Sequence, residues 1–194
     1  MWKGGGLGHR NMIMITLGTG VGGGVITNGR IMVGGHGAGG EIGHVCVNYE
    51  ETEVCGCGSR GCLEQYASAT GIARMARKRL MKNEDATVLR ETKLEDISAK
   101  TVFDAVKEGD AVACEIANDF GRYLGYALAN LAVITDPDII VIGGGVSRAG
   151  EVLLDYVTKY FNERVFFANK DCAFALATLG NDAGIYGAAK LVLK

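Results

Sequence analysis

Three cysteines within eight positions, Cys55, Cys57 and Cys62, are the residues of this sequence best suited to bind a metal ion. Zinc takes about four nitrogen or sulfur ligands in a tetrahedral arrangement. His44 is the nearest of the three histidines, so we predict that it completes the set. Cys46 is the alternative fourth ligand, and free, buried cysteines are the alternative to a metal site. Because protein atoms would occupy all four positions, the zinc would stabilise the loop and would not act as a Lewis acid.

Two glycine-rich segments could surround phosphate oxygens with unhindered backbone amides. The first carries a hydroxyl and joins two apolar runs, and the second lies between an apolar run and a helical pattern. Their residues are Thr19, Gly20, Val21, Gly22, Gly23 and Gly24 in the first segment, and Gly143, Gly144 and Gly145 in the second. Neither matches the P-loop or the dinucleotide fingerprint, and a plain glycine-rich hairpin is the alternative for the first. Together the two segments favour a nucleotide site.

Glu41 and Glu64 place carboxylates on either side of the predicted metal loop. Carboxylates accept hydrogen bonds from neutral hydroxyls. A zinc-bound imidazole keeps its second N–H free, so His44 could also contact a ligand. The alternative is that Glu64 begins a helix, where acidic residues are favourable, and that Glu41 is simply solvated. The residue pattern leaves both interpretations open.

The composition argues against nucleic-acid and membrane partners. The 194 residues are 48% hydrophobic, which allows a sizeable core, and carry a formal net charge of −2. No basic block or stripe is visible, as a nucleic-acid surface would require. No apolar run approaches the roughly 18 residues of a membrane span, and the first residues lack the apolar core of a signal peptide. We therefore expect a cytoplasmic protein.

The hydrophobic pattern predicts a mixed α/β architecture in which helices pack on a sheet. The hairpin signal Asn28-Gly29 helps to predict an antiparallel meander, and the all-apolar run 138–142 is typical of a strand buried on both faces. We predict strands at 12–17, 25–27, 30–33, 138–142 and 172–179, and helices at 63–81, 98–108, 111–135, 150–166 and 183–194. The basic residues of the first helix, among them Arg74, are interpreted as a solvated face. No linker is evident, so we predict a single domain over residues 1–194.

Four segments resemble the ROK family of bacterial sugar kinases and repressors. They are LGTGVGGGVITNG (17–29), GAGGEIGHVCV (37–47), CGCGSRGCLEQYASATGI (55–72) and IIVIGGGVS (139–147). The resemblance covers essentially the whole chain, and the run from Gly37 to Ile72 is most similar to the glucokinases of Gram-positive bacteria. It implies an actin-like ATPase, or ribonuclease-H-like, fold with a zinc-binding loop at 44–62.

The resemblance also implies an activity and its ligands. The activity is transfer of the γ-phosphate of ATP, with Mg²⁺, to O6 of glucose. Zinc would be held by His44, Cys55, Cys57 and Cys62, and sugar hydroxyls would be bound by Glu41, His44 and Glu64. Residues 20–27 would contact the ATP phosphates, and the 143–147 loop would contact the adenosine end. Members of the family are commonly dimers or tetramers, so we expect a homo-oligomer such as a dimer.

Two kinase motifs of the family are not found in this sequence at the positions where the family carries them. Family kinases begin with a domain that carries a D-x-G-G-T phosphate motif, and the Asp of an Asn-Asp pair is the general base for the sugar hydroxyl. That base lies shortly before the stretch that matches residues 1–3, so we expect this chain to be the C-terminal lobe without the N-terminal domain. Because phosphoryl transfer needs a group that orients the nucleophile, we expect negligible turnover by the chain alone.

Three other functions remain open. A sugar-sensing ROK repressor would need a DNA-binding segment, and this sequence contains none. Within the kinases, N-acetylmannosamine, N-acetylglucosamine or fructose could replace glucose. The third alternative is a structural zinc module that binds neither sugar nor nucleotide.

Overall fold

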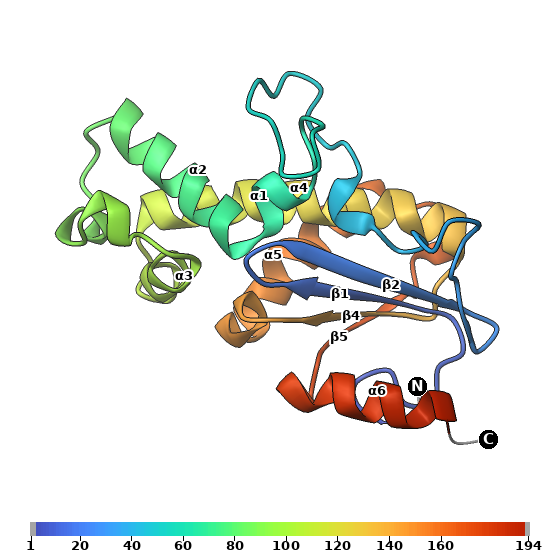
Figure 1. Cartoon of the computed structure of the whole chain (residues 1–194). Coiled ribbons are helices and arrows are strands. Elements are labelled where there is room, and N and C mark those ends of the chain that lie inside the picture. Colours follow the sequence, from blue (N-terminus) through green and yellow to red (C-terminus); the bar gives the residue numbers. More distant parts are fainter. Residues whose placement is uncertain (1–2, 193–194) are drawn as a thin grey trace.

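A mixed five-stranded sheet lies at the centre of the structure, a computed structural model that describes residues 3–192 (Figure 1). The strands lie in the order β3-β2-β1-β4-β5. Their bounds are β1 Met12–Leu17, β2 Val21–Thr27, β3 Arg30–Ile31, β4 Ile139–Gly143 and β5 Ala173–Leu176. The first three pair antiparallel, as predicted for the meander. Because β4 pairs in parallel with both β1 and β5, the carboxyl ends of these three strands meet at one end of the sheet.

Helices flank this sheet, with α4 and α5 on one face and α6 on the other (Figure 1). Their bounds are α1 Glu64–Ala67, α2 Ala69–Lys82, α3 Ala99–Lys107, α4 Ala111–Thr135, α5 Glu151–Arg164 and α6 Ala183–Val192. Successive side chains of β1 point to opposite faces of the sheet, so this strand contributes residues to the packing on both faces. Ile13 and Ile15 are fully buried in the large core beneath the helices, whereas Met12 packs with Val141 on the opposite face. All five residues of β4 are buried, as predicted for a strand covered on both sides.

The long helix α4 has the bounds that its hydrophobic stripe predicts. Asp110 caps it by accepting a hydrogen bond from the Ala113 amide at 2.8 Å, and Asp136 ends it in a left-handed conformation before Pro137. At Gly125 a side chain would lie 2.6 Å from the Val157 carbonyl, so glycine permits the close approach of α5. No helix within residues 3–192 has the length and apolar character that crossing a membrane requires.

Two predicted elements differ from the structure near the candidate site. The helix predicted over 63–81 is broken at Ser68, whose side chain accepts from the Gly71 amide at 2.9 Å and donates to the Glu64 carbonyl at 2.7 Å. The extended Ser68 backbone caps α2, so two helices replace one. The second strand begins at Val21 instead of 25, because pairing with β1 extends it through Gly22–Gly24. These three glycines therefore belong to a strand and not to a connecting loop.

The remaining differences are at element ends. β3 contains only Arg30 and Ile31, since the chain leaves the sheet before the left-handed turn at Gly34. The strand predicted over 172–179 is shorter, as are the helices predicted over 98–108, 150–166 and 183–194. Residues 193–194, where the last helix was predicted to end, lie outside the described part of the chain.

Candidate functional site

The four predicted zinc ligands lie together, with His44 and Cys57 exposed and Cys55 and Cys62 buried. His44 ends a short 3-10 helix, Ile42–His44, and the three cysteines come from the loop 55–62 that precedes α1. One ligand atom from each of the four residues lies within 4.8 Å of all the others. The Sγ atoms of Cys57 and Cys62 are 3.6 Å apart, close to the edge of about 3.8 Å expected for a tetrahedron with Zn–S bonds of about 2.3 Å. The donor set and its spacing thus fit a zinc ion.

Glycines and backbone hydrogen bonds close the loop around this cluster. The Gly58 amide donates to the Cys55 carbonyl at 2.8 Å, and the Cys55 amide donates to the Ser59 carbonyl at 2.7 Å. Gly58 and Gly61 have φ angles of 88° and 70°, which other residues rarely adopt. Cys46, the alternative ligand, lies opposite Cys62 in a single antiparallel bridge and is outside the group of four.

The thiols of the cluster have unequal acidity. A hydrogen bond from the Ser59 backbone lowers the pKa of Cys57, and hydrogen bonds with Cys62 and Cys55 act in the same direction. Burial, together with hydrogen bonding to Cys57 and Cys55, raises the pKa of Cys62 to about 12. Because a metal binds the thiolate, it must displace the proton of Cys62, so zinc binding by this cluster should release protons and strengthen as the pH rises.

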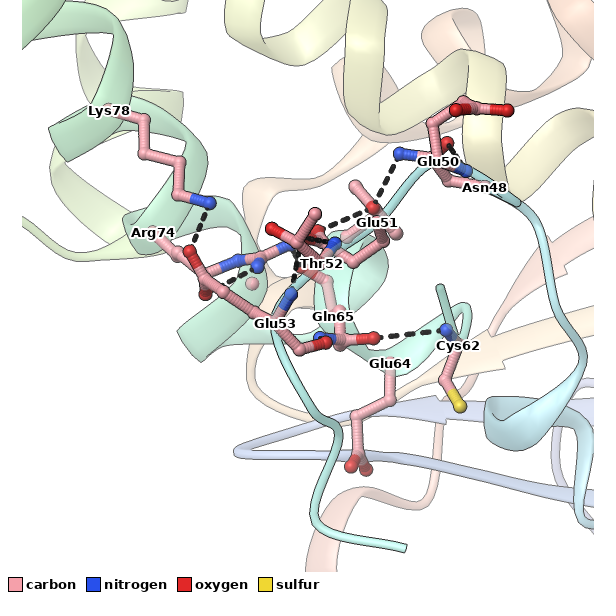
Figure 2. A network of polar contacts seen from close by, with 12 residues as sticks. Asn48, Glu50, Glu51, Thr52, Glu53, Cys62, Glu64, Gln65, Arg74 and Lys78 are labelled. Carbon is pink, nitrogen blue, oxygen red and sulfur yellow. Dashed lines mark hydrogen bonds and ion pairs between the residues drawn. The ribbon is translucent and has the colours of Figure 1, made fainter. Parts of the chain in front are cut away.

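An ion-pair network on α2 supports the metal loop and was not predicted from the sequence. Arg74 lies 2.8 Å from both Glu51 and Glu53, and Lys78 also pairs with Glu53 (Figure 2). The side chain of Arg74 is only 21% exposed, so its interpretation as part of a solvated face is wrong. Its pairing with carboxylates from the preceding loop outweighs solvation. The network joins α2 to the segment that leads into Cys55.

Glu51 has the least exposed side chain of this network, at 9%. Burial raises the pKa of its carboxyl, but hydrogen bonds from the Tyr66 hydroxyl, the Glu53 amide and Arg74 outweigh burial and lower the pKa to about 2. The Tyr66 hydroxyl lies 2.6 Å from Glu51, and the Tyr66 ring stacks on Tyr123 of α4 at 4.0 Å. Glu51 therefore remains charged at neutral pH and ties the metal loop to the helical layer.

Gln65 joins the two arms of the metal loop directly. Its side-chain oxygen accepts from the Cys62 amide at 3.1 Å, and its side-chain nitrogen donates to the Glu53 carbonyl at 3.0 Å (Figure 2). One planar amide thus fixes the distance between the segment before Cys55 and the segment that carries Cys62. A single polar residue within a helical pattern gives no sequence signal for such a role.

Glu64 lies between the metal loop and the first glycine segment. Its Oε2 atom accepts a hydrogen bond from the Val21 amide at 3.0 Å, and its Oε1 atom lies 3.7 Å from the Cys55 sulfur. At Gly20 a side chain would lie 2.2 Å from Oε2, so only glycine permits this approach. Glu41 immediately precedes the 3-10 helix that carries His44, and its side chain is exposed.

The two glycine segments converge at the carboxyl ends of β1 and β4. Thr16 pairs with Gly143, and Gly144 has a φ of 89° where a side chain would lie 2.4 Å from the Leu17 carbonyl. In contrast, a side chain added at Gly22, Gly24 or Gly145 would meet no atom within 4 Å. The backbone at these positions is open to a ligand. In α/β sheets, ligands prefer this end of the strands.

Comparison with known proteins identifies the family. A model of the ROK family matches residues 1–194. The chain belongs to the ROK family. A curated ROK relative, the glucokinase of Halalkalibacterium halodurans, is 47% identical over 99% of this chain and 59% of its own length. A xylose repressor of Caldicellulosiruptor bescii is 29% identical over 81% of this chain and 39% of its own length.

Solved ROK structures confirm the predicted fold. The structure of a ROK family glucokinase from Streptomyces griseus in complex with glucose and AMPPNP matches with a TM-score of 0.85 at 38% identity. The match covers 96% of this chain and 61% of that glucokinase. The ROK chain described above therefore has the actin-like ATPase fold of the sugar kinases, and it spans about three fifths of the length of the glucokinases it matches.

Proposed function

We propose that residues 1–194 form the C-terminal domain of a ROK glucokinase, which transfers the γ-phosphate of ATP to O6 of glucose. The observation that carries the proposal is the position of Glu64. Its carboxylate lies beside the zinc-type cluster and contacts the amide of Val21 in the glycine segment. This position supports the proposal, because a sugar kinase needs a group that binds a sugar hydroxyl next to a loop that binds phosphate. The 47% identity to a glucokinase supports glucose as the sugar.

The proposed roles follow from the chemistry of each group. Backbone amides of the segment Thr19–Gly24 other than that of Val21, which donates to Glu64, would bind the ATP phosphates. Gly143, Gly144 and Gly145 would line the adenosine end. Glu41 and Glu64 would accept hydrogen bonds from sugar hydroxyls. His44 would bind the metal through one ring nitrogen and donate a hydrogen bond from the other.

Zinc and magnesium would have separate functions in this proposal. Zinc held by His44 and the three cysteines would rigidify the loop and supply no ligand position for substrate. Mg²⁺ bound to ATP would neutralise the transferred phosphoryl group. The two Asn-Asp pairs of this sequence, at 118–119 and 181–182, lie far from the position that the resemblance gives the catalytic pair. We therefore propose that the 194-residue chain binds substrates but transfers phosphate at a negligible rate.

A sugar-sensing regulator is the second candidate, because a xylose repressor also matches most of this chain. A regulator of this kind needs a sugar site but no site for the γ-phosphate of ATP. Titration of the zinc-loaded chain with MgATP separates the two. Saturable binding of MgATP supports the kinase, and sugar binding without nucleotide binding supports the regulator.

Replacing Glu64 by glutamine tests the sugar site. The variant keeps an acceptor for the Val21 amide but loses the negative charge, and hydrogen bonds to charged groups contribute about 1.5–3 kcal/mol. We therefore expect glucose affinity, measured by isothermal titration calorimetry, to fall at least about tenfold. The zinc content should stay at one per chain.

The matched control is Glu50→Gln, an exposed carboxylate in the segment that precedes Cys55. It should leave glucose affinity unchanged. Unchanged glucose affinity in Glu64→Gln would contradict the proposed sugar role. A parallel titration with N-acetylmannosamine, N-acetylglucosamine and fructose identifies the sugar, and tighter binding of any of these than of glucose would overturn the glucose assignment.

A further inference from the structure

The junction between α1 and α2 contacts the first glycine segment through hydrogen bonds that the proposed function does not use. The Ala69 amide donates to the Gly18 carbonyl at 2.7 Å, and the Thr70 hydroxyl donates to the Thr19 carbonyl at 2.6 Å. The backbones joined here are about 50 positions apart in the sequence. Together with the bond from Val21 to Glu64, they hold both ends of the turn 18–21.

The turn has little else to fix its conformation. A side chain added at Gly18 would find its nearest neighbour only at 4.0 Å, so no packing restrains the backbone there. Within the turn itself, the Gly18 amide donates to the Gly20 carbonyl at 2.9 Å. Glycine has the largest conformational freedom to lose, so the order of such a turn depends on hydrogen bonds from outside it.

The side that donates these hydrogen bonds is rigid. Ser68 is fully buried, and its hydroxyl bonds both to the Glu64 carbonyl and to the Gly71 amide. Glu64 and Ser68 thus hold the start of α2 in a fixed relation to the metal loop. Thr70 extends from this fixed point and is itself exposed, so its side chain adds little to the core.

We propose that Thr70 is a positioning residue for the nucleotide. Its hydroxyl holds the Thr19 carbonyl so that the amides of Thr19 and Gly20, and the open backbone at Gly22 and Gly24, face the phosphates. The choice of a nucleotide as the ligand rests on the proposed function. The effect of Thr70 on the conformation of the turn does not. The hydrogen bonds of the Thr70 hydroxyl are with the Thr19 carbonyl and with the Ser68 hydroxyl, at 2.9 Å, and not with a predicted metal ligand.

Substitution of Thr70 by valine tests the proposal, because valine keeps the shape and removes the hydroxyl. Amide hydrogen exchange of Gly18 and Val21, measured by NMR on the zinc-loaded 194-residue chain, should accelerate about three- to tenfold, the equivalent of one hydrogen bond. The dissociation constant of MgATP should rise by a similar factor. Zinc content and glucose affinity should remain at the wild-type level.

Two further variants make the test specific. Thr70→Ser keeps the hydroxyl and should stay within about twofold of wild type in both measurements. Thr158→Val removes a hydroxyl that bonds to the Leu154 carbonyl at 2.8 Å within α5, and it should change neither. Unchanged exchange and unchanged MgATP affinity in Thr70→Val would overturn the proposal. If exchange responds but the wild-type chain binds no MgATP, the nucleotide function is overturned, and the role assigned to Thr70 in nucleotide binding fails with it.

Discussion

Replacing Cys62 by serine is expected to abolish zinc binding and to destabilise the domain. Cys62 is fully buried and lies two residues before Glu64, so the segment that loses its metal is the segment that carries the proposed sugar ligand. Structural zinc contributes on the order of 10 kcal/mol to the folding of small sites, and 1 kcal/mol shifts the melting temperature of a domain of this size by about 2–4 °C. We expect the melting temperature to fall by more than about 10 °C and glucose binding to be lost.

Cys46→Ser is the matched control for this experiment. Cys46 is a partly buried cysteine opposite Cys62 in the same bridge, but it lies outside the group of four. It should retain one zinc per chain, measured by metal analysis, and a melting temperature close to that of wild type. Zinc loss in Cys46→Ser together with zinc retention in Cys62→Ser would contradict the predicted ligand set.

The second large effect is expected for Gly144→Val, at the point where the two glycine segments meet. Gly144 has a φ of 89°, and a side chain there would lie 2.4 Å from the carbonyl oxygen and 2.7 Å from the amide nitrogen of Leu17. Both atoms are backbone at the end of β1 and cannot move aside. A left-handed valine and the forced separation of β1 from β4 should lower the free energy of unfolding by about 3 kcal/mol or more.

The same substitution should lower the affinity for MgATP at least about tenfold, because it displaces both segments of the proposed nucleotide site. Urea unfolding and MgATP titration measure the two effects. Gly145→Ala is the control for stability, since Gly145 has a φ of −61° and a side chain there would meet no atom within 4 Å. A stable Gly144→Val variant with normal MgATP affinity would show that neither stability nor nucleotide binding depends on the close approach of the two segments.

Local signals in the sequence predicted the elements whose own residues decide their structure. The stripe and caps of α4, the turn at Asn28-Gly29 and the all-apolar β4 are of this kind. The order of the strands was not predictable, because the parallel placement of β4 between β1 and β5 depends on contacts more than 100 residues apart for one of its two pairs. The break at Ser68 and the early start of β2 likewise result from tertiary contacts that override local propensity.

In the candidate site, too, some features follow from local sequence and others depend on tertiary contacts. Residue type and spacing were sufficient to predict the group formed by His44 and the three cysteines. The groups that hold it were not predictable, because Arg74 has the pattern of a solvated helix residue and is only recognisable as a partly buried partner once Glu51 lies beside it. The contact between Glu64 and Val21 spans 43 positions and has no local signal. Such supporting contacts determine whether a predicted ligand set becomes a site.

X-ray absorption at the zinc edge, with and without saturating glucose, is the most direct test of the account. We predict three sulfur ligands at about 2.3 Å and one nitrogen ligand at about 2.0 Å, unchanged when glucose binds. This result would establish zinc as the closed support of a sugar site formed by neighbouring side chains. An oxygen ligand that enters the zinc coordination shell with glucose, or a chain that binds glucose without zinc, would contradict it.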